Sequence, residues 1–360
     1  MKKHNFSAGP CILPQEVLTK ASEAVLNFNN LDLSLIEISH RSKDFVEVME
    51  NARSLVKDLL NLSDDYSVLF LQGGASLEFL MSAYNLMKVN GKAAYLDTGT
   101  WSSKAIKEAK LLGEVIEMAS SKDQGYNYIP KNFEVPENAD YVHYTSNNTI
   151  YGTQLKEFPK SNGLLVCDMS SDIFSRTLDF SQFDLIYAGA QKNMGPAGTT
   201  LVVVKDEILG KTGRNIPSML DYQVHIKKDS MFNTPSVFAV YVSMLTLQWL
   251  KDLGGIKAIE KINNKKATLL YAEIDRNPLF KGFANKEDRS AMNVTFNLTD
   301  DAYKETFDKI WNEAGISGIK GHRSVGGYRA SLYNALPIES VQVLVDAMIQ
   351  LEKQIYKLKN

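Results

Sequence analysis

A lysine and an aspartate each follow a short apolar stretch of the kind that forms a buried strand. Lys192 lies just beyond the apolar residues 183–188, and Asp168 directly follows residues 164–167. A lysine that is crowded by apolar groups or by another cation loses its proton readily, and its amine can then condense with a carbonyl group. A carboxylate can keep a pyridine nitrogen protonated. The pair therefore predicts a pyridoxal phosphate site, with Lys192 bound to the cofactor aldehyde and Asp168 paired with the ring nitrogen.

A glycine-rich turn, QGGAS at 72–76, separates the apolar residues 67–71 from a helical pattern at 75–87. The first N–H groups of a helix lack partners within the helix and favour an anion. We therefore expect Ala75 and Ser76 to hold the cofactor phosphate. The turn contains neither GxxxxGK[ST] nor GxGxxG, so a plain strand-to-helix turn is the alternative interpretation.

Two further side chains are expected at the same edge of the predicted sheet. Trp101 follows the strand candidate 93–96 and can stack on a pyridine ring, although a single tryptophan more often packs in a core. Thr149 follows the strand candidate 139–143, in a polar segment that is also typical of a plain turn. Both residues are candidate cofactor contacts.

Histidine and arginine are concentrated in two segments. His40 and Arg41 stand just before a predicted helix, and His322, Arg323 and Arg329 lie in a glycine-framed segment. The planar guanidinium group suits carboxylate and phosphate groups. Three arginines and two histidines favour a substrate with more than one negative group, whereas solvated surface loops are the alternative.

The composition is that of an ordinary soluble globular protein. Of the 360 residues, 44% are hydrophobic and 23% are charged, which does not indicate disorder. The formal net charge of -2 argues against a nucleic-acid partner. The only cysteines, Cys11 and Cys167, lack the spacing of a metal site, and neither a metal nor a disulfide framework is expected.

We expect a cytoplasmic protein with no membrane partner. The N-terminus carries two lysines without the apolar stretch of a secretory signal. The most apolar helix candidate, 237–250, is too short to span a bilayer and is interrupted by polar residues.

Apolar runs of strand length alternate with helical patterns along the first two thirds of the chain. This alternation predicts an α/β fold with a largely parallel sheet and ligands at the carboxyl ends of its strands. The connection 191–198 is too short for a parallel crossover, so the strand 199–204 is expected to run antiparallel to its predecessor. From about residue 255 the pattern changes to that of an α+β unit. We therefore expect an N-terminal segment (1–15), a large cofactor-binding domain (16–255) and a small C-terminal domain (256–360).

Four motifs, in their order and spacing, resemble those of the phosphoserine aminotransferases, which are fold-type I pyridoxal phosphate enzymes. The motifs are ISHRSKDF at 38–45, AGAQKN at 188–193, NTPS at 233–236 and GHRSVGGYRAS at 321–331. The resemblance covers nearly the whole chain. It implies a large domain with a mainly parallel seven-stranded sheet flanked by helices, a smaller C-terminal α+β domain, and a homodimer with shared active sites.

The activity that the resemblance implies is reversible transamination of 3-phosphohydroxypyruvate with L-glutamate, giving O-phospho-L-serine and 2-oxoglutarate in serine biosynthesis. Some bacterial members also act on 4-phosphohydroxy-L-threonine in pyridoxine biosynthesis. No metal is implied.

The resemblance also implies roles for individual residues. The implied cofactor contacts are Ala75, Ser76, Trp101, Thr149, Asp168, Gln191 and Lys192, with Asn233 and Thr234 reaching the cofactor phosphate of the neighbouring subunit. The implied substrate contacts are Arg41 for a side-chain carboxylate or the phosphate, Arg329 for the α-carboxylate, and His40, His322 and Arg323 for the phosphate pocket. Some members carry arginine in place of Ser76, and this arginine helps to bind the substrate phosphate. His322 and Arg323 are therefore expected to contribute more to phosphate binding in this chain.

Several alternatives remain at this point. Another fold-type I enzyme, such as an alanine-glyoxylate aminotransferase, is the nearest one, while a cysteine desulfurase would need a mobile loop cysteine that Cys11 and Cys167 are poorly placed to supply. A nucleotide-binding oxidoreductase lacks its dinucleotide fingerprint here. The third alternative is a non-catalytic protein that binds phosphorylated ligands.

Overall fold

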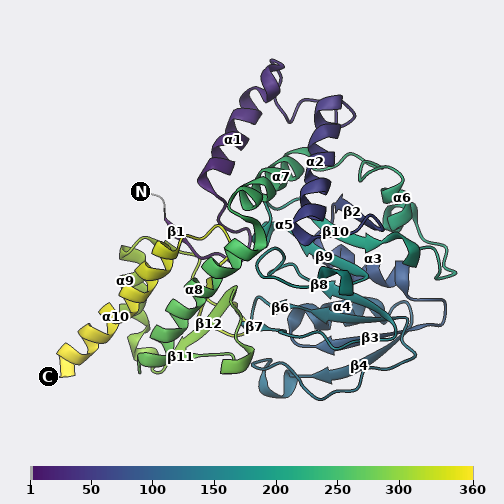
Figure 1. Ribbon diagram of the computed structural model, residues 1–360. Helices are drawn as coiled ribbons and strands as arrows, with labels where there is room; N and C mark the ends of the chain where they lie inside the picture. Colours follow the sequence, from purple (N-terminus) through teal and green to yellow (C-terminus); the bar gives the residue numbers. More distant parts are fainter. Residues whose placement is uncertain (1–2, 360) are drawn as a thin grey trace.

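A seven-stranded β-sheet forms the centre of the computed structural model, which describes residues 3–359 (Figure 1). In spatial order its strands are β2 (Tyr66–Leu71), β10 (Thr200–Lys205), β9 (Leu185–Gly189), β8 (Leu164–Asp168), β5 (Tyr141–Thr145), β3 (Lys92–Asp97) and β4 (Glu114–Ser120). Only β10 runs antiparallel to its neighbours, which confirms the prediction made from its short preceding connection. The expected mainly parallel α/β sheet is therefore confirmed.

Helices cover both faces of this sheet (Figure 1). The helices of the first two thirds of the chain are α1 (Gln15–Leu26), α2 (Lys43–Leu60), α3 (Gly74–Leu86), α4 (Thr100–Ala109), α5 (Ala190–Asn193), α6 (Tyr222–Ile226) and α7 (Val237–Asp252). Successive strand residues point to opposite faces. In β9, Leu185 and Tyr187 belong to the core under α3 and α4, whereas Ile186 and Ala188 belong to the core under α2 and α7. Both faces are therefore buried, as the continuous apolar runs predicted.

Helix α2 shows how local sequence sets an element's ends. Ser42 caps it, accepting a hydrogen bond from the Phe45 backbone N–H at 3.4 Å. At the other end Asn61 adopts a left-handed conformation with φ of 51°, which stops the helix. Between them the buried residues recur every three or four positions and pack against α7. The helix prediction directly after His40 and Arg41 is therefore confirmed.

The C-terminal part forms a second, smaller layer beside the large sheet (Figure 1). Its antiparallel sheet contains β11 (Phe280–Gly282), β12 (Asn293–Leu298) and β14 (Tyr328–Ser331), and its helices are α8 (Gly255–Arg276), α9 (Lys304–Glu313) and α10 (Ile338–Lys359). Arg329 was expected in a glycine-framed loop. It lies instead in β14, because residues 328–331 pair with β12.

The N-terminal segment joins this second layer. Strand β1 (His4–Asn5) pairs in parallel with β13 (Ile316–Ser317), and Phe6 and Ile12 pack into the apolar core formed by residues 267–355. These two-residue strands have no periodicity that a sequence pattern could reveal. The same holds for β6 (Asn147–Asn148) and β7 (Thr153–Gln154), which form a two-stranded ribbon.

Short 3-10 turns complete the described chain. They are η1 (Phe28–Asn30), η2 (Lys122–Gln124), η3 (Phe180–Gln182), η4 (Asp206–Ile208), η5 (Ser218–Leu220), η6 (Lys286–Asp288) and η7 (Asp301–Tyr303). Among the helices in residues 3–359, none combines the length and apolar character needed to cross a bilayer.

One buried carboxyl group, that of Glu78, is expected to make the unfolding free energy depend on pH. Glu78 of α3 is fully buried, accepts a hydrogen bond from the Tyr222 hydroxyl at 2.6 Å, and its pKa is raised to about 8 by that burial. The native state therefore retains a proton that the unfolded chain releases above its ordinary pKa, so this group lowers stability as pH rises from about 4.3 towards 8. We expect Glu78→Gln to flatten this part of the dependence of the unfolding free energy on pH, whose slope for one group approaches about 1.4 kcal/mol per pH unit.

Urea unfolding of both proteins between pH 5 and pH 8 measures this difference. The unfolding free energy of the variant, relative to that of the native chain, should increase as the pH rises. A difference that stays constant across this range would contradict the assignment of a protonated Glu78.

Candidate active site

One cavity of about 360 Å³ lies at the edge of the large sheet where the parallel strands end. Its walls come from the segments that follow β2, β3, β8 and β9, together with the N-terminal segment and β14. The lining residues are Ala8, Gly9, Gly74, Ala75, Ser76, Phe79, Trp101, Thr149, Ile150, Asp168, Ser170, Gln191, Lys192, His322 and Arg329. Parallel α/β sheets carry their ligands at this edge.

Lys192 belongs to the one-turn helix α5 directly after β9. Its Nζ donates a hydrogen bond to Thr149 Oγ1 at 2.9 Å and stands 5.2 Å from the centre of the Trp101 ring. Burial lowers the pKa of Lys192 to about 8, an effect that Arg329 reinforces and Asp168 opposes. A considerable fraction of the amine is therefore neutral near physiological pH, and this neutral form is the one that attacks carbonyl groups.

Asp168 is the last residue of β8 and is only 4% exposed. One carboxylate oxygen accepts a hydrogen bond from the Ser170 backbone N–H at 2.9 Å. Burial raises the pKa of Asp168, while the nearby Lys192 and the hydrogen bonds from Ser170 oppose that rise. A buried carboxylate with so few donors strongly favours a cationic partner in the cavity.

The amino end of α3 supplies a place for an anion. Gly73 and Gly74 have positive φ values of 99° and 66°, which lets the chain turn sharply from β2 into the helix. Gly74, Ala75 and Ser76 all line the cavity. Their N–H groups stand at the first helical positions, where no carbonyl within the helix can reach them.

Trp101 is held at the cavity by the first turn of α4. The buried carboxylate of Asp97 accepts hydrogen bonds from Ser102 at 2.9 Å, from Ser103 at 2.8 Å and from the Tyr126 hydroxyl at 3.0 Å. These bonds fix the turn that carries the indole. Sequence reasoning did not single out Asp97, although it ends an apolar strand just as Asp168 does.

Two basic side chains come from the C-terminal layer. Arg329 Nη1 donates to the Thr149 carbonyl at 3.4 Å, while its Nε is buried without a partner. Burial lowers the pKa of Arg329. His322 is exposed at the cavity mouth, and its pKa is lowered by partial burial and by the nearby charges of Arg329, Arg323 and Lys104. The buried Nε of Arg329, which has no partner in the described chain, favours an anionic ligand at this mouth.

The remaining candidate residues do not line the cavity of the described chain. They are His40, Arg41, Arg323, Asn233 and Thr234. His40 is 9% exposed and its Nε2 has no partner, whereas Arg41 and Arg323 are exposed. The segment of Asn233 and Thr234 is tied to Gln72, whose Nε2 donates to the Thr234 carbonyl at 2.8 Å.

Some lining residues escaped the sequence analysis. They are Ala8, Gly9, Phe79, Ile150 and Ser170. Gly9 approaches the catalytic segment closely, since a Cβ there would stand 3.4 Å from Lys192 Cγ. No local pattern reports a contact between residues so far apart in the chain, although Ser170 could have been found from its position beside Asp168.

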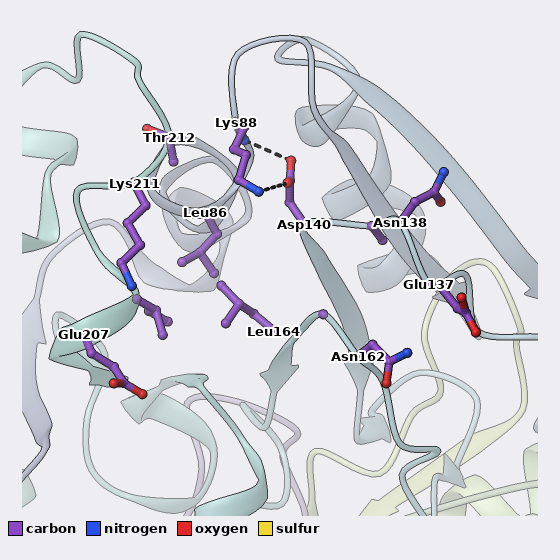
Figure 2. A pocket seen from close by; sticks show the side chains of 13 residues that line it. Leu86, Lys88, Glu137, Asn138, Asp140, Asn162, Leu164, Glu207, Lys211 and Thr212 are labelled. Atoms are coloured by element: carbon purple, nitrogen blue, oxygen red, sulfur yellow. Dashed lines mark hydrogen bonds and ion pairs between the residues drawn. The ribbon is translucent and has the colours of Figure 1, made fainter.

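A larger cavity, of about 510 Å³, lies at the opposite edge of the sheet (Figure 2). Its walls include Leu86 and Leu164, and Lys88 is ion-paired with Asp140 at 3.2 Å. The charges in Figure 2 are of both signs, and no reactive amine is buried there. Size alone therefore does not identify the functional cavity.

The family model for class-V aminotransferases matches residues 3–344. The chain belongs to this family, within the group of phosphoserine aminotransferases. A phosphoserine aminotransferase of Flavobacterium johnsoniae is 72% identical over 356 residues, which cover 99% of this chain and 100% of the relative.

Solved structures agree with this membership. Phosphoserine aminotransferase from Bacillus circulans subsp. alkalophilus has 41% identity and a TM-score of 0.95, covering 98% of this chain and 99% of that one. The pyridoxal phosphate-bound enzyme from Trichomonas vaginalis has 35% identity and a TM-score of 0.92, covering 97% and 100%. The chain is thus a pyridoxal phosphate-dependent transaminase of fold type I, and the oxidoreductase and non-catalytic alternatives are set aside.

The residues of the cavity fit pyridoxal phosphate. A partly neutral lysine amine suits the aldehyde, a buried carboxylate suits the pyridine nitrogen, and the indole of Trp101 offers a flat surface for the ring. The unpartnered N–H groups at the start of α3 suit the phosphate. Each of these groups lines the same cavity.

The lowered pKa of Lys192 leads to a prediction for the protein without cofactor. Only the neutral amine reacts with formaldehyde, so the rate of reductive methylation of Lys192 should rise with pH around a midpoint of about 8. Because Asp168 raises the pKa of Lys192, Asp168→Asn should move the midpoint to lower pH. Peptide mass spectrometry measures the rate, with the exposed Lys211 as an internal reference. A midpoint near the ordinary lysine value of about 10.4 would overturn the assignment.

Proposed function

We propose that this chain transfers the amino group of L-glutamate to 3-phosphohydroxypyruvate, giving O-phospho-L-serine and 2-oxoglutarate. The observation that carries the proposal is that one cavity contains a partly neutral lysine, a buried carboxylate and an arginine whose Nε has no partner. Relatives that are 56–72% identical to this chain bear the name phosphoserine aminotransferase, which supports the same reaction.

Pyridoxal phosphate, when bound, supplies an aldehyde that carries the amino group and a ring that accepts electrons from the substrate α-carbon. Lys192 would hold the cofactor through its Nζ. Its freed Nζ then acts as the general base that takes the α-proton. The low pKa of this amine suits the role, because a base works best when its pKa lies near the working pH.

The other cofactor residues bind the cofactor and set the properties of its ring and of the lysine amine. Asp168 keeps the ring nitrogen protonated, and Trp101 supports the ring from one face. Thr149 accepts a hydrogen bond from Lys192 Nζ and so orients the amine. The N–H groups of Ala75 and Ser76 bind the phosphate, and Gln191 borders the same cavity.

Substrate recognition relies on the cations at the mouth of the cavity. Arg329 holds the α-carboxylate, for which its buried, unpartnered Nε provides an unused donor. His322 and Arg323 bind the substrate phosphate. Serine at position 76, in place of a cation, leaves more of that interaction to these two residues.

We propose a homodimer in which each active site is completed by the neighbouring subunit. Asn233 and Thr234 do not line the cavity of their own chain, and the exposed aromatic residues Phe232 and Phe238 flank them in sequence. His40 and Arg41 lie similarly outside that cavity, beside exposed apolar residues such as Ile36. Exposed apolar residues beside polar candidate residues that do not line the cavity of their own chain favour a subunit interface at these positions.

Three finer points are part of the same proposal. The enzyme works in the cytoplasm, it also accepts the 4-phosphohydroxy-L-threonine pair, and its large and small domains meet near residue 255. The last point is supported by the positive φ of Gly254 and Gly255 and by the two separate apolar cores.

The phosphate pocket can be tested by comparing 3-phosphohydroxypyruvate with hydroxypyruvate. Charge-assisted bonds are worth about 1.5–3 kcal/mol each, so His322→Ala or Arg323→Ala should lower kcat/KM for the phosphorylated substrate by about 10- to 100-fold. The preference for the phosphorylated compound should shrink accordingly. Lys320→Ala is the matched control, because this lysine of the same segment is ion-paired with Asp308 at 3.7 Å and lies outside the cavity. Equal losses with both substrates would contradict the phosphate assignment.

The shared site can be tested by mixing two defective chains. Lys192→Ala should abolish turnover and the visible absorbance of the bound cofactor, while the double variant Asn233→Ala/Thr234→Ala should bind cofactor weakly. In a hybrid dimer one of the two sites is intact, so co-expression should restore about a quarter of native activity. Mixtures no more active than the separate variants would argue against a shared site.

A further inference from the structure

A lysine far from the cofactor cavity in sequence is completely buried without an acidic partner. Lys266 of α8 is 0% exposed, and its Nζ donates to the backbone carbonyls of Leu332 at 2.9 Å, Tyr333 at 2.8 Å and Leu336 at 3.2 Å. Within residues 3–359 no carboxylate forms an ion pair with it. Burial lowers the pKa of Lys266 to about 7. A buried cation is costly unless its hydrogens are used, and one turn of the chain offers a carbonyl to each of the three hydrogens of the protonated amine.

The turn held by Lys266 directly follows β14, the strand that carries Arg329. Its residues also contact the cofactor cavity. The Tyr333 hydroxyl donates to the carbonyl of Ala8, a lining residue, at 2.8 Å. The Asn334 backbone N–H donates to Asn193 Oδ1 at 2.9 Å, and Asn193 is the residue after Lys192. One short segment thus connects the arginine to the catalytic lysine.

Asn263, three residues before Lys266 on α8, contacts the same turn. Its Nδ2 donates to Asn334 Oδ1 at 2.8 Å and to the Ser175 carbonyl at 3.0 Å. Residues three apart on a helix lie on one face, so Asn263 and Lys266 approach the turn together. Both are buried, at 1% and 0% exposure.

Helix α8 is a firm base for this contact because it belongs to both apolar cores. Ile256 and Ile259 pack with the core of the large sheet, whereas Leu270 and Ile274 pack with the C-terminal core. The two polar residues lie between these pairs in sequence. A shift of the turn relative to α8 would therefore break hydrogen bonds rather than slide over an apolar surface.

We propose that Lys266, assisted by Asn263, is a positioning residue that fixes Arg329 relative to Lys192 and thereby sets the binding of the amino-acid carboxylate. The inference rests on the proposed function of Arg329. Lys266 does not touch the substrate, and it acts only through the turn that follows β14. Methionine at this position would fill a similar volume but could not donate to any of the three carbonyls.

The experiment starts with steady-state kinetics of the native enzyme. If glutamate and 3-phosphohydroxypyruvate are not transaminated, the proposed function fails, and that result is distinct from any result with the variants. Lys266→Met should then raise KM for glutamate and lower kcat/KM by about 10- to 100-fold, as displacement of a binding group by about 1 Å does. The absorbance of the bound cofactor should remain that of the native enzyme.

A matched control and a second background separate positioning from general destabilisation. Lys265→Met changes the adjacent, exposed lysine of the same helix and should leave KM for glutamate unchanged. In an Arg329→Gln background, Lys266→Met should lower kcat/KM only slightly further. The effects of two residues are not additive when one acts through the other. Equal losses in both backgrounds, or an unchanged KM for glutamate, would overturn the proposal.

The variant Asn263→Ala covers the case in which Lys266→Met does not fold. It removes the hydrogen bonds to Asn334 and to the Ser175 carbonyl and retains the lysine, and alanine favours the helix. Asn263→Ala should raise KM for glutamate severalfold in the native background. In the Arg329→Gln background it should leave that KM almost unchanged. A lower melting temperature with no change in that KM would refute the positioning role.

Discussion

The chemistry of this enzyme depends on withholding water from one amine and one carboxylate. Burial lowers the pKa of Lys192 and raises that of Asp168, and each charge partly offsets the shift of the other. The amine thereby becomes a usable nucleophile and base, and the carboxylate gains a strong preference for a cationic ring nitrogen. Either residue at a solvated surface would have neither property.

The large sheet creates this environment because its strands are parallel and buried on both faces. Asp168 ends β8, Lys192 follows β9, and Trp101 follows β3, so their side chains emerge at one edge. Helix α3 adds unpartnered N–H groups at the same place. The network around Asp97 then fixes the indole, so that a loop between strand and helix behaves as a rigid part of the site.

The C-terminal layer closes the cavity from the other side. Its arginine, Arg329, lies in a strand rather than in a free loop, and the following turn is bonded both to α8 and to Asn193. The N-terminal segment passes between the layers, pairs with β13 and places Gly9 against Lys192. The walls of the cavity are thus built from parts of the chain that are remote in sequence.

The sequence by itself determined most of the elements and pointed to the candidate reactive residues. Apolar runs and their spacing were sufficient for the parallel sheet, the antiparallel β10 and the capped start of α2, because strand burial, connection length and capping are local properties. Strand ends likewise revealed Lys192 and Asp168, and the motifs indicated the family.

Only the tertiary structure decided which distant groups meet. The pairing of β14 with β12, the contact of Gly9 with Lys192 and the buried bonds of Lys266 join residues that are far apart in the sequence. The pKa of Lys192 is equally non-local, since it follows from the burial and charges that several segments create together. Local patterns cannot report such contacts, because they record the period of an element and not the surface against which it packs.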